Sequence, residues 1–195
     1  IVPKRISPNG DADGAQITTG AAHLRTRLSE SMAVEGFIRV RENRFDIDGT
    51  ANDDPNATGR ARATTWRLAT SGVFLDERLT TNLSVAQTRS RREFLNPPNA
   101  PGGSLQDDDY FSRRRFLDAS ARYAAGGNTV LLAGIQSTRD RVEQRTATLG
   151  GFSFRQNVDA AQDSWAAFAQ VQTRVLDRLD LVAGARREEP DGYSG

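Results

Sequence analysis

Residues 164–186 constrain the fold of this chain more than any other stretch, because two consecutive runs alternate there with period two. In the first run, uncharged side chains share one face: Trp165, Ala167, Ala169, Val171 and Val175. After a short turn at Asp177 and Arg178, the second run alternates in the same way. A long hairpin with one uncharged face and one polar face is typical of an outer-membrane β-barrel. Spacings of three and four residues in this stretch also fit a helix, so the rest of the chain has to decide.

Four short turns divide the chain into strand pairs. They are centred near residues 30, 77, 127 and 178, about fifty residues apart, and polar stretches at 46–63, 96–112 and about 150–163 separate the pairs. Short turns on one side and long loops on the other are typical of outer-membrane barrels, in which the turns are periplasmic and the loops extracellular. The sequence therefore predicts an all-β fold, an antiparallel transmembrane β-barrel segment of about eight long strands. A soluble β-propeller-like domain is the alternative, since kelch-type blades repeat at a similar length.

Composition excludes several classes of function. The 26 basic and 25 acidic residues give a net charge of +1, so no general field attracts nucleic acid. Cysteine is absent and His23 is the only histidine, which leaves too few side chains for a transition-metal site or a Ser-His-Asp arrangement, and an enzyme is not expected. The low mean hydropathy of −0.58 suits a barrel wall, where only the outward residue of each pair must be apolar.

Several motifs point to a known family. Residues 167–170 (Ala-Phe-Ala-Gln), 174–179 (Arg-Val-Leu-Asp-Arg-Leu) and 183–186 (Ala-Gly-Ala-Arg) resemble a recurrent hairpin of TonB-dependent outer-membrane receptors. Ala185 stands where that hairpin usually has Leu, and Arg187 where it has Tyr. Residues 74–83 and 116–123 are similar to mid-barrel strands of the siderophore and cobalamin receptors. The resemblance covers most of residues 14–187.

This resemblance implies a multi-pass barrel of 22 strands in the outer membrane, which imports a metal chelate such as a ferric siderophore or cobalamin. Its partners would be the chelate, outer-membrane lipid and lipopolysaccharide, and the TonB complex through parts missing from this chain. Because the chain starts at Ile1 and ends in a loop-like stretch, we expect residues 1–195 to be a fragment of one barrel domain without the plug. A passive porin or a structural outer-membrane barrel is the alternative function.

Candidate ligand-binding residues lie in the stretches interpreted as extracellular loops. Aromatic rings there can stack on a ligand, and arginines can engage an anionic ferric chelate. The candidates are Asp107, Asp109, Tyr110, Phe111, Arg113, Arg114, Phe152, Phe154 and Arg155. Pairing of the aspartates with the arginines, or of the arginines with lipopolysaccharide phosphates, is the alternative interpretation.

Three further groups of residues carry expectations. Asp46, Asp48, Asp53 and Asp54 cluster carboxylates as calcium prefers, although the EF-hand spacing fails, and no other cofactor is expected. Trp66, Trp165 and Tyr123 suit the aromatic girdles at the membrane interfaces. The alternation turns four arginines towards the lumen, where we expect them to pair with carboxylates of neighbouring strands or a plug: Arg39, Arg41, Arg122 and Arg174.

Overall fold

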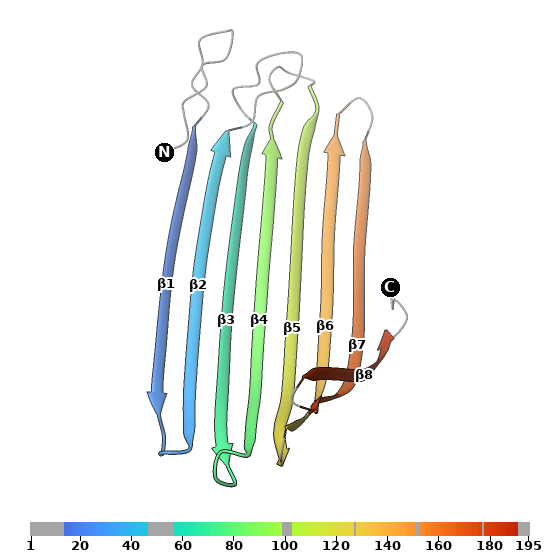
Figure 1. Cartoon of the computed structure of the whole chain (residues 1–195). Coiled ribbons are helices and arrows are strands. Elements are labelled where there is room, and N and C mark those ends of the chain that lie inside the picture. The colour runs from blue at the N-terminus through green and yellow to red at the C-terminus, as the bar shows by residue number, and fades with distance from the viewer. Residues whose placement is uncertain are drawn as a thin grey trace.

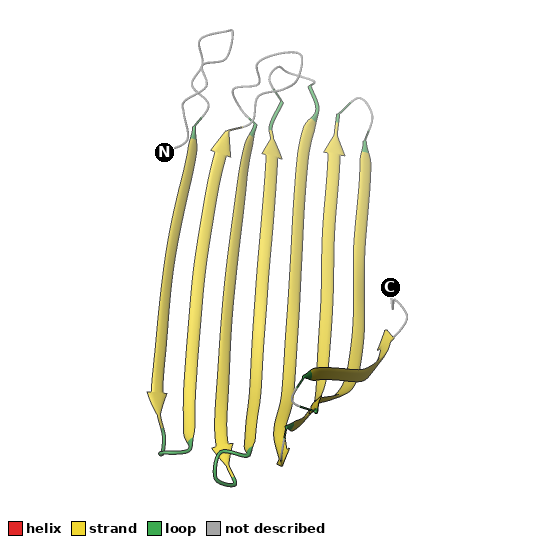
Figure 2. Ribbon diagram, viewed as in Figure 1, coloured by secondary structure: helices red, strands yellow, loops and turns green. Residues whose placement is uncertain are grey.

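The computed structural model describes residues 14–46, 57–98, 103–126, 128–150, 153–176 and 178–190. They form one antiparallel sheet in which every strand pairs with its neighbours in the sequence (Figures 1 and 2). The strands are β1 (Ala15–Arg27), β2 (Met32–Asp46), β3 (Thr58–Phe74), β4 (Leu79–Asn96), β5 (Leu105–Gly126), β6 (Thr129–Leu149), β7 (Phe154–Val175) and β8 (Leu179–Pro190). In the part of the chain that is described, no helix is long and apolar enough to cross a membrane. The predicted all-β fold of eight long antiparallel strands is confirmed.

The short turns lie where the sequence predicts them, although Gly127 and Asp177 fall outside the described residues. In the turn between β3 and β4, the three residues 75–77 have positive φ angles of 55°, 53° and 68°. The amide of Arg78 closes this turn by donating to the carbonyl of Leu75 at 3.1 Å. Gly126, with φ of 103°, supplies the corresponding bend before β6, where a side chain would be strained.

The long loops predicted from the sequence are shorter than expected. Much of the stretches 46–63, 96–112 and 150–163 is strand, because β3 starts at Thr58, β5 at Leu105 and β7 at Phe154. Their backbone pairing continues without a break to the ends, as in the register Asp107 to Leu95. These extensions carry polar residues on both faces, so their sequences show no alternation of apolar and polar residues. The interpretation of these stretches as loops is wrong for the parts that are strand.

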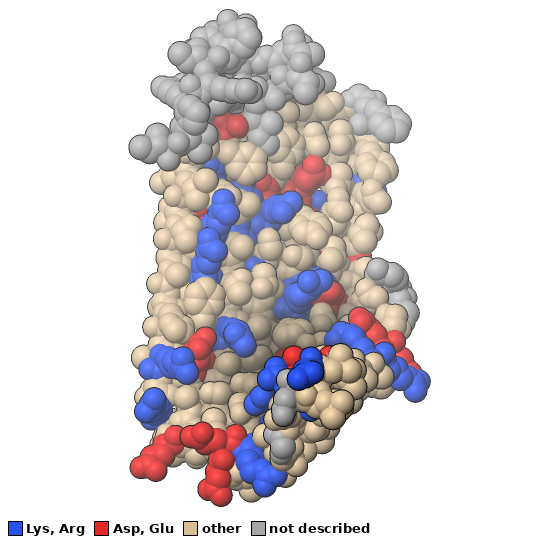
Figure 3. All heavy atoms as spheres, viewed as in Figure 1, with Lys and Arg blue, Asp and Glu red and all other residues tan. Residues whose placement is uncertain are grey.

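The register divides the side chains into an inner face and an outer face. Arg186 of β8 donates to the amide oxygen of Gln136 on β6 at 2.8 Å, which spans the intervening strand β7. Between them Ala166 is only 3% exposed. In Figure 1, β8 and the adjoining end of β7 fold towards the viewer, and the face turned to the viewer in Figure 3 is hollowed and carries both basic and acidic side chains. We call this concave side, which contains Ala166, the inner face.

The outer face carries a continuous apolar band on the half of the sheet nearest the short turns. Its side chains include Ile38, Leu68, Leu83, Leu117, Ile135, Val171 and Leu181, each between 36% and 56% exposed. On β7 the band runs from Trp165 to Val175, which matches the roughly 9–11 residues that a tilted strand needs to cross hydrocarbon. Among the described residues the only buried apolar side chains are Ala57 and Ala166. The sheet therefore has no apolar core of its own, and the band faces outwards as it does in a membrane barrel.

The three predicted girdle residues lie on this outer face. Trp66 and Trp165 stand where the band gives way to polar positions, next to Thr64 and Asp163 respectively. Tyr123 lies at the opposite border, directly across from Leu79 and close to the turns. Aromatic side chains at both borders of an apolar band are typical of membrane interfaces.

Candidate functional site

A groove of about 560 Å³ crosses the sheet between β4 and β7. It lies farther from the short turns than the apolar band does. Tyr110, Ser112 and Arg114 enter it from β5, because alternate residues of a strand share a face. Thr88, Asp140 and Gln162 from the other three strands complete its polar wall. Most of these side chains belong to the inner face. We call this groove the Tyr110 groove.

Charge in the Tyr110 groove is organised around Arg114. Its guanidinium donates to both carboxylate oxygens of Asp140, at 2.7 Å and 2.8 Å. The hydrogen bonds that Arg114 donates to Asp140 raise the pKa of Arg114 above its ordinary value, so the side chain stays charged. Arg92 lies directly opposite Tyr110 on β4 and forms no ion pair with a described carboxylate. The groove therefore combines a phenol ring with cationic groups, which suits an anionic ligand with a flat surface.

A second, smaller hollow of about 230 Å³ lies on the inner face near the short turns. Arg25, Glu35, Arg67, Asn82 and Asp118 line it together with Ser84, which is only 5% exposed. Asp118 accepts a hydrogen bond from Gln136 at 2.9 Å. This hollow lies behind the apolar band, so the same stretch of wall is apolar on one face and polar on the other.

The lumen-facing arginines predicted from the alternation all lie on the inner face. Their predicted pairing with carboxylates holds for one of them. Arg174 donates to both oxygens of Asp180, at 2.8 Å and 3.1 Å. Arg41 donates instead to the amide oxygen of Asn43 at 3.1 Å. Arg39 and Arg122 have no ion pair with a carboxylate in the described part of the chain, so positive charge remains on this face.

The predicted ligand-binding residues are divided between the two faces of the sheet. Tyr110, Arg114 and Phe154 lie on the inner face, whereas five others lie on the outer face: Asp107, Asp109, Phe111, Arg113 and Arg155. Phe152 lies outside the described residues. The prediction that these residues lie in loops is wrong for all eight described residues, because they belong to β5 or β7, where neighbours in the sequence point to opposite sides.

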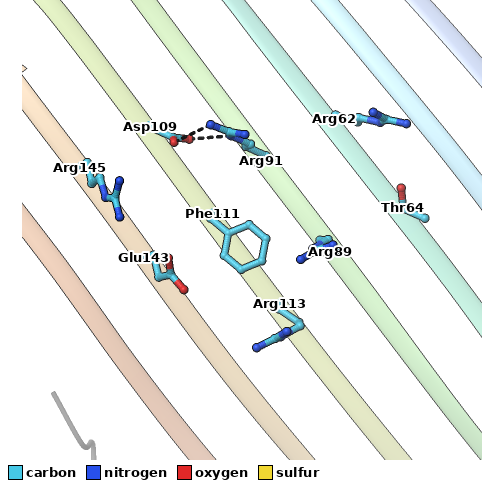
Figure 4. Close-up of a pocket in the computed structure, with 9 residues that line it drawn as sticks. All are labelled: Arg62, Thr64, Arg89, Arg91, Asp109, Phe111, Arg113, Glu143 and Arg145. Carbon is cyan, nitrogen blue, oxygen red and sulfur yellow. Dashed lines mark hydrogen bonds and ion pairs between the residues drawn. The ribbon is translucent and has the colours of Figure 1, made fainter.

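On the outer face, two of these residues contact arginines of β4. Asp109 accepts two hydrogen bonds from Arg91, at 3.1 Å and 2.9 Å, and the guanidinium of Arg89 lies 5.1 Å from the ring centre of Phe111 (Figure 4). Residues 107–115 thus contribute to two separate surfaces. Asp140, Thr88 and Gln162 were missed as groove residues, and Arg92 as a neighbour of Tyr110, because only the strand register brings them close to Tyr110 and Arg114.

The predicted calcium site has little support in the described residues. Asp46 ends β2, whereas Asp48, Asp53 and Asp54 lie outside the described ranges. Within those ranges, no group of three or more His, Cys, Asp or Glu side chains is placed to hold a metal ion. Calcium binding by the four aspartates stays a prediction.

Solved structures share this architecture. No family model matches the sequence, and no curated protein matches it. The copper transporter OprC covers 96% of this chain with a TM-score of 0.73 and 12% identity. The ferric yersiniabactin uptake receptor FyuA from Yersinia pestis covers 92% with 0.74 and 14%, and the ferripyoverdine receptor of the outer membrane of Pseudomonas aeruginosa covers 91% with 0.72 and 12%.

The fold is that of part of an outer-membrane β-barrel. At the level of fold, the resemblance to TonB-dependent receptors seen in the sequence is confirmed. The chain spans 30% or 31% of the length of these three proteins, so it corresponds to part of such a barrel. The named neighbours are transporters and receptors, and none is described as an enzyme. In membrane barrels of this fold the concave face turns to the lumen and the apolar band turns to lipid.

Proposed function

We propose that this chain is a wall segment of a TonB-dependent outer-membrane receptor that imports a metal chelate such as a ferric siderophore or cobalamin. The observation that carries the proposal is the division of one sheet into a lipid-type apolar band and a polar, hollowed inner face. That division accompanies a fold shared with receptors for iron chelates and a copper transporter. Energy would come from the TonB complex, which would act through parts of the protein outside this chain.

The chemistry of the inner face supports an anionic ligand. Arg39, Arg92 and Arg122 lie there without a described carboxylate partner, and unpaired positive charges on a concave face attract ligands of the opposite sign. Tyr110 adds a half-buried aromatic surface next to Arg92. Ferric siderophores carry acidic oxygen donors around the metal, so the Tyr110 groove is the part of this wall that we assign to chelate contact.

A passive porin and a structural barrel remain the alternative functions, and they share the apolar band. They differ from a receptor in ligand affinity and in conductance. A porin conducts ions steadily through a water-filled channel, whereas a receptor binds its ligand saturably and needs energy to release it inwards. The two readouts therefore separate the classes.

The test uses the full-length protein that contains this chain, purified in detergent and also reconstituted in planar bilayers. Equilibrium binding is measured with a ferric catecholate, a ferric hydroxamate and cobalamin, and steady conductance is measured without ligand. Saturable binding of one probe together with no steady conductance supports the receptor. Steady conductance without saturable binding would identify a porin, and extraction of the protein into plain buffer as a monomer would rule out a membrane barrel.

A further inference from the structure

Arginines stand directly opposite one another on the outer face, just above the apolar band. Arg89 of β4 is in register with Arg113 of β5, and Arg113 is in register with Arg141 of β6. Like charges placed directly opposite each other destabilise a sheet unless something neutralises them. A row of three arginines across three strands therefore calls for anions on this surface.

Carboxylates of the chain neutralise only part of this charge. Arg141 lies 3.0 Å from Glu143 and 2.9 Å from Asp159, and Arg91 pairs with Asp109. Four other arginines of the outer face, in or near this row, have no carboxylate partner among the described residues: Arg62, Arg89, Arg113 and Arg145. Arg62, Arg89 and Arg145 are exposed, and Arg113 is half-buried.

These four arginines lie around one groove. It has a volume of about 700 Å³, and its floor includes Phe111, Thr64 and the paired Asp109 (Figure 4). Arg89 lies against the ring of Phe111 at 5.1 Å, which holds its guanidinium over an apolar surface. We call Arg62, Arg89, Arg113 and Arg145 with Phe111 the outer arginine cluster.

The height of the outer arginine cluster matches a lipid headgroup. Arg113 comes four residues before Leu117, and Arg89 comes four residues after Val85, both of which are exposed members of the apolar band. Four residues of strand span roughly 13 Å, or about 10 Å along the membrane normal at a tilt of about 40°. Arginine side chains extend down from such positions towards phosphate groups at the membrane surface.

We propose that the outer arginine cluster binds the phosphate groups of a phosphorylated glycolipid of the lipopolysaccharide type in the outer leaflet. The inference rests on the proposed function only for its membrane location. The lipid is favoured over a soluble anion because the apolar band lies directly beneath the cluster and can hold acyl chains. A chelate in the lumen has no access to this face, since the sheet lies between them.

The experiment measures binding of bis-phosphorylated lipid A to the delipidated full-length protein in detergent. The double variant Arg89→Gln/Arg113→Gln should bind lipid A at least about tenfold more weakly, because two charge-assisted phosphate contacts are lost. The matched control, Arg39→Gln/Arg41→Gln, removes the same charge from the inner face and should bind normally. Arg113→Lys should retain more binding than Arg113→Gln, because it keeps the charge.

Three outcomes would overturn the proposal: no binding by the wild type, equal loss in the inner-face control, or equal binding of dephosphorylated lipid A. Competition by inorganic phosphate alone at low concentration would identify a soluble-anion site and also count against a lipid. Chelate binding is measured on the same samples. Absence of chelate binding by the wild type with intact lipid A binding argues against the transport function alone, so the two failures are distinguishable.

Discussion

Tyr110 and Phe111 are adjacent in the sequence and belong to different surfaces of the protein. Tyr110 lies opposite Arg92 on the inner face, whereas Phe111 lies opposite Arg91 on the outer face and contacts Arg89. A ligand in the lumen can therefore meet one ring and not the other. This relationship provides a matched pair of variants in a single dipeptide.

Tyr110→Ala should weaken chelate binding to the full-length protein by about tenfold, because a stacking surface in the Tyr110 groove is lost. Phe111→Ala should leave chelate binding within experimental error. Isothermal calorimetry with the chelate found to bind measures both. An equal loss in the two variants would show that Tyr110 has no special contact with the ligand.

Trp66 and Trp165 should report on lipid. Both lie on the outer face at the border of the apolar band, with Trp165 43% exposed. Fluorescence quenching by brominated acyl chains should fall when either residue is replaced by Phe, whereas quenching by a soluble chelate should not change. Equal quenching of wild type and both variants by brominated lipid would contradict the assignment of the outer face.

An arginine introduced at Ala119 should destabilise the barrel by about 2–4 kcal/mol, since this position lies within the band between Leu83 and Ile135. Ser120→Arg, one residue further on and on the polar inner face, serves as the control and should cost much less. Urea unfolding of the full-length protein in lipid vesicles gives both values. Similar losses of stability in both variants would mean that both faces lie in equally apolar surroundings, which would contradict the assignment of the outer face to lipid.

Gly134→Ala should be destabilising by about 1–3 kcal/mol, because its new methyl group needs space that the sheet does not have. A Cβ there would lie 2.5 Å from the ring of Phe168 and 2.8 Å from the backbone oxygen of Ala119. At Gly20, by contrast, no atom lies within 4 Å of an added Cβ, so Gly20→Ala should be nearly neutral. The same unfolding measurement compares them, and a neutral Gly134→Ala would show that Phe168 moves aside freely.

The ion pair between Arg139 and Asp163 should contribute to stability at neutral pH and not in strong acid. The hydrogen bond from Arg139 lowers the pKa of Asp163 below its ordinary value of 3.8. The contribution is therefore present above about pH 4 and is lost as the pH falls through the lowered pKa. Asp163→Asn should lower the thermal midpoint at about pH 7 and have a progressively smaller effect as the pH falls below about 4. A difference that persists unchanged in acid would point to a packing effect.

The sequence predicts the part of the fold that lies in the membrane. Between Trp165 and Val175 only one face must be apolar, so alternation reveals the strand and the side to which each residue points. The same rule places Arg39 and Arg174 correctly on the inner face. Helical spacing fits this stretch equally well by itself, and the repeated strand pairs are what resolve the ambiguity.

Beyond the band, the rule loses its physical basis. Around Asp107 to Arg115 water reaches both faces, so no side chain has to be apolar and the strand resembles a loop in sequence. The assignment of Tyr110 and Phe111 to one binding site failed for this reason. The sequence also could not predict the partner of Arg114, because Asp140 is 26 residues away and only the pairing of β5 with β6 brings the two together.

β1 and β8 are each paired on one side only among the described strands. Their outward rows of peptide groups run along the apolar band, where there is no water to satisfy them and an unmet hydrogen bond costs several kcal/mol. Further strands have to bond to both rows before this wall can enter lipid. Insertion of these eight strands into lipid is consequently coupled to the pairing of both edges. Removal of whatever pairs with either edge should block insertion as completely as a deletion within the eight strands.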